Sequence, residues 1–180
     1  MPAELAGPWR AFLDDLDENL TEPVALHCLG GFVVTVVYGL PRPTGDIDVM
    51  SVVPGASLAP LVTVAGERSS LHRTHGVYVD VVAVTTCPDG YEARLSELFP
   101  GCWRHLRLFA LDPYDLTLAK LQRNLQRDRD DVLHVARVAN LDLEVLRTRY
   151  ADELRPYLGR PEREDLTLDL WIAMIRELRG

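Results

Sequence analysis

The sequence predicts an α+β protein with an α/β lobe over residues 1–111 and a helical lobe over residues 112–180. In the first lobe, short apolar runs rich in β-branched residues alternate with turns rich in glycine and proline, as is typical of buried strands. In the second lobe, apolar residues recur at helical spacing, with little glycine or proline between them. The change of pattern at Asp112 and Pro113 therefore marks the boundary between the lobes.

The elements of the first lobe follow from these patterns in chain order. Trp9, Phe12 and Leu16 lie at helical spacing and predict a helix over residues 8–20. Strands are expected over residues 24–29, 46–53, 77–84 and 106–111, and helices over residues 32–38 and 58–65. The segment between residues 39 and 45 holds two glycines and two prolines, so it predicts a loop.

The helical lobe begins with a clear start signal. Asp112 is a good N-cap because its carboxylate can accept a backbone hydrogen bond, and Pro113 suits the first helical position. Helical patterns then predict helices over residues 113–126, 130–139, 142–150 and 165–178.

Charge and composition limit the classes of function. The net charge of -8 comes mainly from the first hundred residues, which argues against a general nucleic-acid binder with a basic face. Basic residues between positions 104 and 129 still leave room for a local basic wall. A carboxylate-rich first lobe also suits a divalent-metal site.

The cellular setting is predicted to be cytoplasmic, without a membrane contact. The longest apolar stretch, residues 24–40, contains His27 and a glycine pair and is too short for a membrane span. The acidic first twenty residues do not have the pattern of a secretory signal. Cys28, Cys87 and Cys102 form no CxxC pair, which fits thiols in a reducing compartment.

Three aspartates stand out in otherwise apolar strands. Side chains alternate along a strand, so Asp46 and Asp48 project from the same face, while Ile47 points to the other. Asp80 is again a single carboxylate in an apolar strand, and if that strand is a neighbour, three carboxylates converge. Like charges repel unless a cation lies between them, and oxygen ligands suit Mg²⁺ or Mn²⁺. The pattern therefore predicts a site for divalent metal ions.

A glycine pair, Gly30 and Gly31, lies between the first predicted strand and the following helix. Glycine lets the backbone approach a ligand closely, and free amides at a helix start favour phosphate. Such a pair is usually only a turn, and a lone Asp-x-Asp often lies on a solvated edge. The order of strand, glycine pair, helix, loop, Asp-x-Asp strand and Asp strand is far more specific than any one part.

The stretch LGGFVVTVVYGLPRPTGDIDV resembles the signature of the polymerase β-type nucleotidyltransferases, a glycine turn followed by Asp-x-Asp. It is more closely similar to small bacterial stand-alone members related to the AbiEii-type toxins of toxin–antitoxin systems. A second resemblance lies in the helical lobe, where Lys120 precedes an Arg-Asp-x-x-Asp pattern formed by Arg127, Asp128 and Asp131.

This resemblance implies a mixed sheet flanked by helices, with the helical lobe as the other wall of a nucleotide cleft. Asp46 and Asp48 would bind the metal ions, and Asp80 would complete the site and help to activate the attacking hydroxyl. Gly30 and Gly31 would hold the triphosphate. By the second resemblance, Lys120 would contact nucleotide phosphate.

Four assignments keep a simpler alternative beside the functional one. Arg42 and Thr44 are candidates for nucleotide binding because arginine pairs with phosphate, or they are a loop arginine and a turn-stabilising threonine. Lys120 is either a nucleotide contact or a solvated helical lysine. Asp128 and Asp131 share a helix face, where they either pair with Arg127 and Arg123 or orient Lys120; structural pairing is favoured for Asp128 and the wall of the nucleotide site for Asp131.

The resulting hypothesis is a metal-dependent nucleotidyltransferase. It would move a nucleoside monophosphate from a nucleoside triphosphate to a hydroxyl on a tRNA, a protein or a small molecule. The toxin-like resemblance favours a tRNA or protein acceptor and adds an antitoxin protein as a candidate partner. The alternative is a nucleotide sensor or interaction module of the same fold that has no catalytic turnover.

Overall fold

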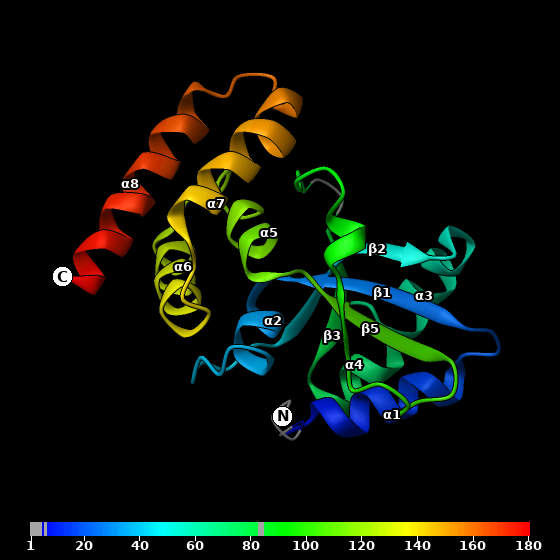
Figure 1. Ribbon diagram of the computed structural model, residues 1–180. Coiled ribbons are helices and arrows are strands. Elements are labelled where there is room, and N and C mark those ends of the chain that lie inside the picture. Colours follow the sequence, from blue (N-terminus) through cyan, green and yellow to red (C-terminus); the bar gives the residue numbers. More distant parts are fainter. Residues whose placement is uncertain (1–4, 6, 83–84) are drawn as a thin grey trace. The chain divides into compact units, whose positions relative to one another are not determined.

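The computed structural model describes residues 5, 7–82 and 85–180, and it divides into two units (Figure 1). We call the first, Met1–Val84 with Leu95–Ala110, the sheet unit. The second, Thr85–Arg94 with Leu111–Gly180, is the helical unit. A short segment before β4 thus belongs to the helical unit, although the chain on both sides of it belongs to the sheet unit.

The sheet unit is built on a five-stranded mixed sheet with the order β3-β2-β1-β5-β4. Strand β1 (Val24–Leu29) pairs antiparallel with β2 (Asp46–Val53) and parallel with β5 (Leu106–Ala110). Strand β3 (Tyr78–Val81) runs parallel to β2, and β4 (Ser96–Leu98) runs antiparallel to β5. The predicted mixed sheet with flanking helices is therefore confirmed.

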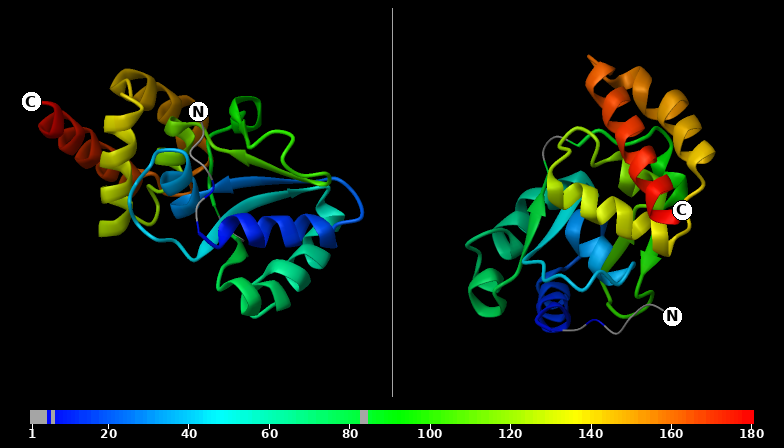
Figure 2. Two further views of the ribbon diagram at one scale, coloured as in Figure 1. Left: turned by 90° about the horizontal axis from the view of Figure 1, so that it is seen from below. Right: turned by 90° about the vertical axis from the view of Figure 1, so that its left-hand side faces the viewer.

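Helices cover the apolar face of this sheet. They are α1 (Trp9–Asn19), α3 (Leu58–Ala65) and α4 (Ser70–His75), with the short 3-10 turn η1 (Gly55–Ser57) before α3. Figure 2 shows these helices grouped together beside the sheet, as their mutual contacts require. Helix α2 (Gly30–Val36) instead follows directly from the end of β1.

Strand alternation separates a buried face from a polar face. Ile47, Val49 and Val79 are almost fully buried, as expected for side chains under the helices. Cys28 is also fully buried, and this burial raises the pKa of its thiol to about 12, so it acts as a small core residue. The residues between the buried ones point to the opposite face, where the candidate site lies.

The helical unit contains four α-helices and three short turns within the described residues. These are η2 (Tyr91–Arg94), α5 (Pro113–Leu118), α6 (Gln126–Val138), α7 (Leu143–Arg149), the π-helical turn η3 (Tyr150–Leu154), η4 (Arg155–Tyr157) and α8 (Glu162–Arg179). The predicted start signal is confirmed, because the Asp112 carboxylate accepts the Asp115 N–H at 2.8 Å.

The prediction of one helix over residues 113–126 is wrong. Helix α5 ends at Leu118, and Asn124 has a φ of 44°, which a continuing right-handed helix does not allow. The Asp128 carboxylate then accepts the Leu125 N–H at 3.0 Å and so caps a new helix. Helix α6 therefore begins at Gln126, earlier than predicted, because the Asp128 carboxylate satisfies an N–H group that has no carbonyl partner in a preceding helical turn.

Smaller differences concern short elements. Helix α2 begins at Gly30, and α4 and β4 were not expected from the sequence. Helix α4 has local signals, since the Ser69 hydroxyl caps its start and Gly76, with a φ of 74°, ends it. The strand predicted to reach residue 84 has β3 at its centre, and its last residues, 83–84, lie outside the described residues.

Ion pairs between neighbouring helices hold the helical unit together. The fully buried Asp115 carboxylate accepts hydrogen bonds from Arg94 at 2.9 Å and from Arg149 at 3.0 Å. Arg94 also donates to Glu153 at 2.7 Å, and Arg149 donates to Asp112 at 2.7 Å. We call these five residues the ion network, in which Asp115 is fully buried and the other four are half-buried. It fixes the segment before β4 to α5 and η3.

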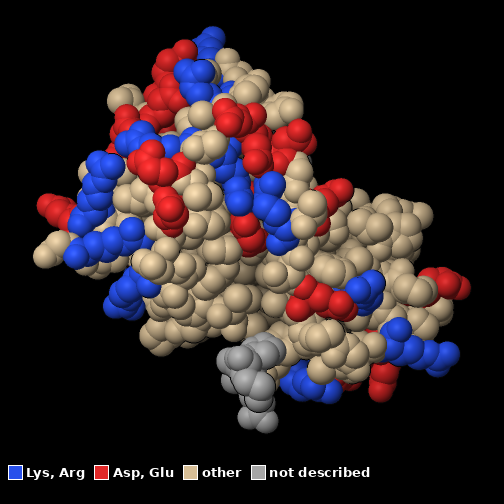
Figure 3. Space-filling model, viewed as in Figure 1, with Lys and Arg blue, Asp and Glu red and all other residues tan. Residues whose placement is uncertain are grey.

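The surface of the helical unit also mixes both signs of charge. Figure 3 shows acidic and basic side chains interleaved over its helices on the face drawn. Arg155 pairs with Asp165 at 2.9 Å, and Arg147 pairs with Asp169 at 3.0 Å. Among the described residues, no helix is long and apolar enough to cross a membrane.

Candidate active site

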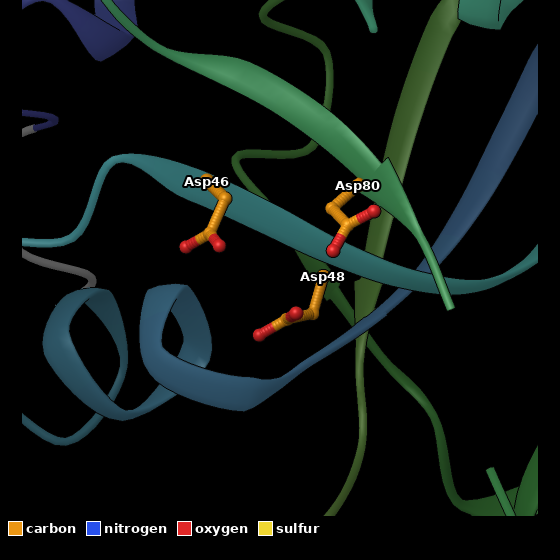
Figure 4. Close-up of side chains that lie close together, drawn as sticks. All are labelled: Asp46, Asp48 and Asp80. Atoms are coloured by element: carbon orange, nitrogen blue, oxygen red, sulfur yellow. The ribbon is translucent and has the colours of Figure 1, made fainter. Parts of the chain in front are cut away.

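The candidate site is a group of three carboxylates on the polar face of the sheet. Asp46 and Asp48 come from β2 and Asp80 from the adjacent β3, where it pairs in register with Asp48. One carboxylate oxygen of each lies within 4.8 Å of the other two. Figure 4 shows all three side chains pointing to the same side of the strands, towards the start of α2. We call this group the carboxylate cluster.

The donor set of the carboxylate cluster fits a divalent cation. Three converging carboxylates repel one another, and this repulsion is relieved when a cation binds between them. Asp46 and Asp48 are half-buried and Asp80 is exposed, so the cluster is open to solvent on one side. Carboxylate oxygens at this spacing can surround one ion or bridge two ions about 4 Å apart. The structure thus brings together the three residues that the sequence pattern predicted to converge.

The glycine turn lies against this cluster. Gly30 has a φ of 71°, a backbone conformation that glycine adopts without strain. A Cβ added at Gly30 would overlap the Asp48 carboxylate and would lie 2.6 Å from Asp48 Cγ. Glycine is therefore required twice, for the backbone angle and for the space that Asp48 fills. Gly31 follows in the buried first turn of α2.

The loop before β2 contributes a hydroxyl to the site. The Thr44 hydroxyl donates to Asp46 Oδ1 at 3.0 Å and lies 3.3 Å from the Asp46 carbonyl oxygen. This contact holds one oxygen of the Asp46 carboxylate and leaves the other for a ligand. Arg42 is half-buried in the same loop, and its carbonyl oxygen accepts the Thr35 hydroxyl at 3.1 Å. The nucleotide-binding assignments of Arg42 and Thr44 stay predictions.

Comparison with known proteins agrees with this geometry. The sequence matches the family described as "Nucleotidyltransferase of unknown function (DUF6036)" over residues 11–178. The chain belongs to this family. No curated protein matches the chain, and no solved structure matches it either. The family places the chain among nucleotidyltransferases, in agreement with the resemblance seen in the sequence, whereas a relation to AbiEii-type toxins stays a prediction.

Sequence reasoning did not single out one residue that lies beside the carboxylate cluster. Tyr78 pairs in register with Asp46 and stands two residues before Asp80, so its side chain lies on the same face as the carboxylate cluster. Burial raises the pKa of the Tyr78 hydroxyl, and the charges of Asp46 and Asp80 raise it further. The available signal was its position two residues from an aspartate in a strand.

The nucleotide contacts expected from the helical lobe lie in a buried ion-paired group. Lys120 is only 5% exposed, and its Nζ donates to Asp131 Oδ2 at 2.8 Å and lies 3.6 Å from Asp128 Oδ1. Asp128 also receives a two-point hydrogen bond from Arg123, which is the structural pairing expected for it. The roles of Lys120 and Asp131 in nucleotide binding stay predictions.

Proposed function

We propose that this family member transfers a nucleoside monophosphate from a nucleoside triphosphate to a hydroxyl acceptor and releases pyrophosphate. The observation that carries the proposal is the carboxylate cluster, formed by two neighbouring strands beside a glycine turn. A polar, like-charged group on an otherwise well-packed sheet is unfavourable for folding and therefore points to a function.

Each residue of the site would have a distinct task. Asp46 and Asp48 would hold Mg²⁺ or Mn²⁺, with Asp80 as the third ligand. The bound metal ions would neutralise charge on the pyrophosphate and lower the pKa of the acceptor hydroxyl. Thr44 would keep the Asp46 carboxylate in position through its hydrogen bond.

The reaction balances without an additional reactant. The acceptor oxygen forms a bond to the α-phosphorus, and the bond from that phosphorus to the pyrophosphate oxygen breaks. Asp80, the exposed member of the cluster, would take the acceptor proton and pass it to solvent. The backbone at Gly30 and Gly31 would hold the phosphates, because it has no side chains to keep a ligand away and Gly30 lies against Asp48 of the cluster.

The acceptor is proposed only as a class of molecule. The resemblance to AbiEii-related proteins favours a tRNA or a protein as the acceptor, with a small molecule as the other candidate. The same resemblance supports a role as the toxin of a toxin–antitoxin pair, with an antitoxin protein as partner. In this proposal Lys120, Asp131 and Arg42 would supply further nucleotide contacts.

The test is label transfer by the purified full chain. The protein is incubated with Mg²⁺ and each of the four nucleoside triphosphates, labelled at the α-phosphate, together with total RNA or cell lysate. We expect label to move to an acceptor and Asp48→Asn to lower the rate by about 10³-fold or more. Removal of metal with a chelator should stop transfer, and Mn²⁺ should restore it.

The matched control is Asp130→Asn, which changes an exposed aspartate that hydrogen-bonds only with Gln126 on its own helix among the contacts described. It should transfer label at the wild-type rate. Metal-dependent binding of triphosphate without transfer to any acceptor would contradict the enzyme and favour a nucleotide sensor. Absence of binding and of transfer would contradict both.

A further inference from the structure

Tyr78 lies on the same face of the sheet as the carboxylate cluster and has no part in the function proposed above, and its ring packs against His72 of α4. Tyr78 on β3 and His72 on α4 have ring centroids 4.7 Å apart and an angle of 41° between their planes. Both side chains are half-buried, so part of each ring reaches solvent. The His72 ring is held in place, since its Nδ1 accepts the Arg68 backbone N–H at 2.8 Å.

Tyr78 and the glycine turn lie on opposite sides of the carboxylate cluster, because Tyr78 belongs to β3 and the glycine turn follows β1. Strand β2 lies between β1 and β3 in the sheet. On the β1 side, Leu29 pairs with Asp48, and the chain then enters the glycine turn. On the β3 side, Tyr78 pairs with Asp46. A ligand that spans the cluster therefore has the glycine turn at one end and Tyr78 at the other.

In a displacement at phosphorus, the leaving group lies at one of these two ends and the acceptor at the other. The attacking oxygen and the leaving oxygen lie on opposite sides of the phosphorus in an in-line displacement. If the pyrophosphate lies at the glycine turn, the acceptor must approach from the side of β3. Asp80, which would receive the acceptor proton, belongs to that strand, as does Tyr78.

We propose that Tyr78, packed against His72, lines the acceptor subsite and that the acceptor presents a nucleoside, free or at the end of a single RNA strand. The inference rests on the proposed function. Exposed bases stack on tyrosine and histidine rings, whereas a base inside a duplex has no free face. Arg68 and Arg73 are exposed close to His72, and the Arg73 guanidinium donates to the Arg68 carbonyl oxygen at 2.6 Å. Their charges suit the phosphates of a strand.

The test measures binding of two probes to three variants of the full chain. The probes are a fluorescent single-stranded RNA of about 12 nucleotides and a labelled non-hydrolysable triphosphate, each with Mg²⁺. Tyr78→Leu removes the ring, and Tyr78→Phe keeps it. The matched control is Phe99→Leu, since Phe99 stacks edge-on with Trp103 at 6.1 Å, at the opposite end of the sheet from the site.

Loss of the ring should act on the RNA probe alone. We expect Tyr78→Leu to weaken RNA binding by about tenfold or more, the size typical of one stacked base, and Tyr78→Phe to stay within about twofold. Triphosphate binding should not change in any variant, and Phe99→Leu should bind both probes like wild type. Competition with adenosine separates the two sources, because displacement of the RNA by adenosine indicates that a free nucleoside suffices.

Several results would overturn the assignment. Equal RNA binding by wild type and Tyr78→Leu would remove Tyr78 from the acceptor subsite, and weaker triphosphate binding alone would place the ring at the other substrate. If Tyr78→Leu does not fold, photocrosslinking of wild type to RNA ending in 4-thiouridine decides, since crosslinks outside residues 68–80 would contradict the proposal. Wild type that binds no triphosphate would instead contradict the proposed function.

Discussion

The carboxylates of the two units face groups of opposite charge, basic in one unit and acidic in the other. In the helical unit, the fully buried Asp115 faces the guanidinium groups of Arg94 and Arg149, so the charge is balanced within the unit. In the sheet unit, the carboxylates of the cluster face one another. A buried acid with basic partners belongs to the structure of the fold. Acids that converge on one another are suited to a cation from solution, and they mark the functional part of the molecule.

The two arrangements of charge have opposite effects on the stability of the fold. Opposite charges at 3 Å attract, and breaking such a buried arrangement leaves a charge without compensation. Like charges at similar distances repel, so their removal should not weaken the fold and can strengthen it. Substitutions in the two regions should therefore separate stability from activity, and the following predictions test this separation.

The largest expected effect on stability is that of Asp115→Ala. The substitution removes the acid to which both Arg94 and Arg149 donate, so we expect the free energy of unfolding to fall by about 3–5 kcal/mol. Urea unfolding measures the change, and Asp48→Asn should be no less stable than wild type in the same assay. Similar losses for the two variants would remove the contrast between the regions.

Gly30→Ala should act mainly on activity. The new Cβ would displace the Asp48 carboxylate, and a misplaced catalytic group lowers the rate by about 100-fold. The matched control is Gly39→Ala, which has a similar φ of 68° but nothing within 4 Å of the added Cβ. Both variants should lose about 1–2 kcal/mol of stability from backbone strain, and only Gly30→Ala should lose label transfer. Equal transfer by both would contradict the close approach to Asp48.

Thr44→Val should lower label transfer by about tenfold because it removes the hydrogen bond to the Asp46 carboxylate while it keeps the side-chain shape. The Mg²⁺ concentration for half-maximal rate should rise at the same time. Thr44→Ser retains the hydroxyl and should behave like wild type. A Thr44→Val enzyme with normal rate and normal Mg²⁺ dependence would show that the hydroxyl only stabilises the turn.

The smallest effect concerns the pH dependence of stability. Burial alone would raise the pKa of Asp128, but hydrogen bonds from Arg123 and the Leu125 N–H outweigh it, so the pKa is lowered from 3.8. A lowered pKa in the folded state stabilises the fold above about pH 4, and this contribution disappears as the pH falls through the folded value. Asp128→Asn should cost about 1 kcal/mol at pH 7 and less below pH 4 in urea unfolding. A constant difference across this range would contradict the ionic role.

Much of the sheet and of the cluster could be predicted because the signals are local. Alternation along a strand fixes which face Asp46 and Asp48 share, and the apolar runs fix where β1 and β2 lie. The Asp112 cap was predictable for the same reason, since one side chain satisfies an amide three residues away. The convergence of Asp80 needed one further assumption, that its strand lies next to β2.

The remaining features depend on contacts between distant parts of the chain. Strand β4 has three residues and forms through its pairing with β5. No local sequence pattern predicts this pairing. Helix α6 begins at Gln126 through a side-chain cap from Asp128, and Lys120 is buried with its Nζ paired to Asp131. The match between Gly30 and Asp48 likewise involves residues from different strands and turns.

The membership of Thr85–Arg94 in the helical unit bears on how this protein can be dissected. The chain passes between the units three times, so no single cut yields both pieces intact. A fragment that starts at residue 112 would lack Arg94, the donor to Asp115 and Glu153, and would expose acids that the whole chain neutralises. Any attempt to express or exchange the C-terminal half alone should therefore carry this ten-residue loop with it.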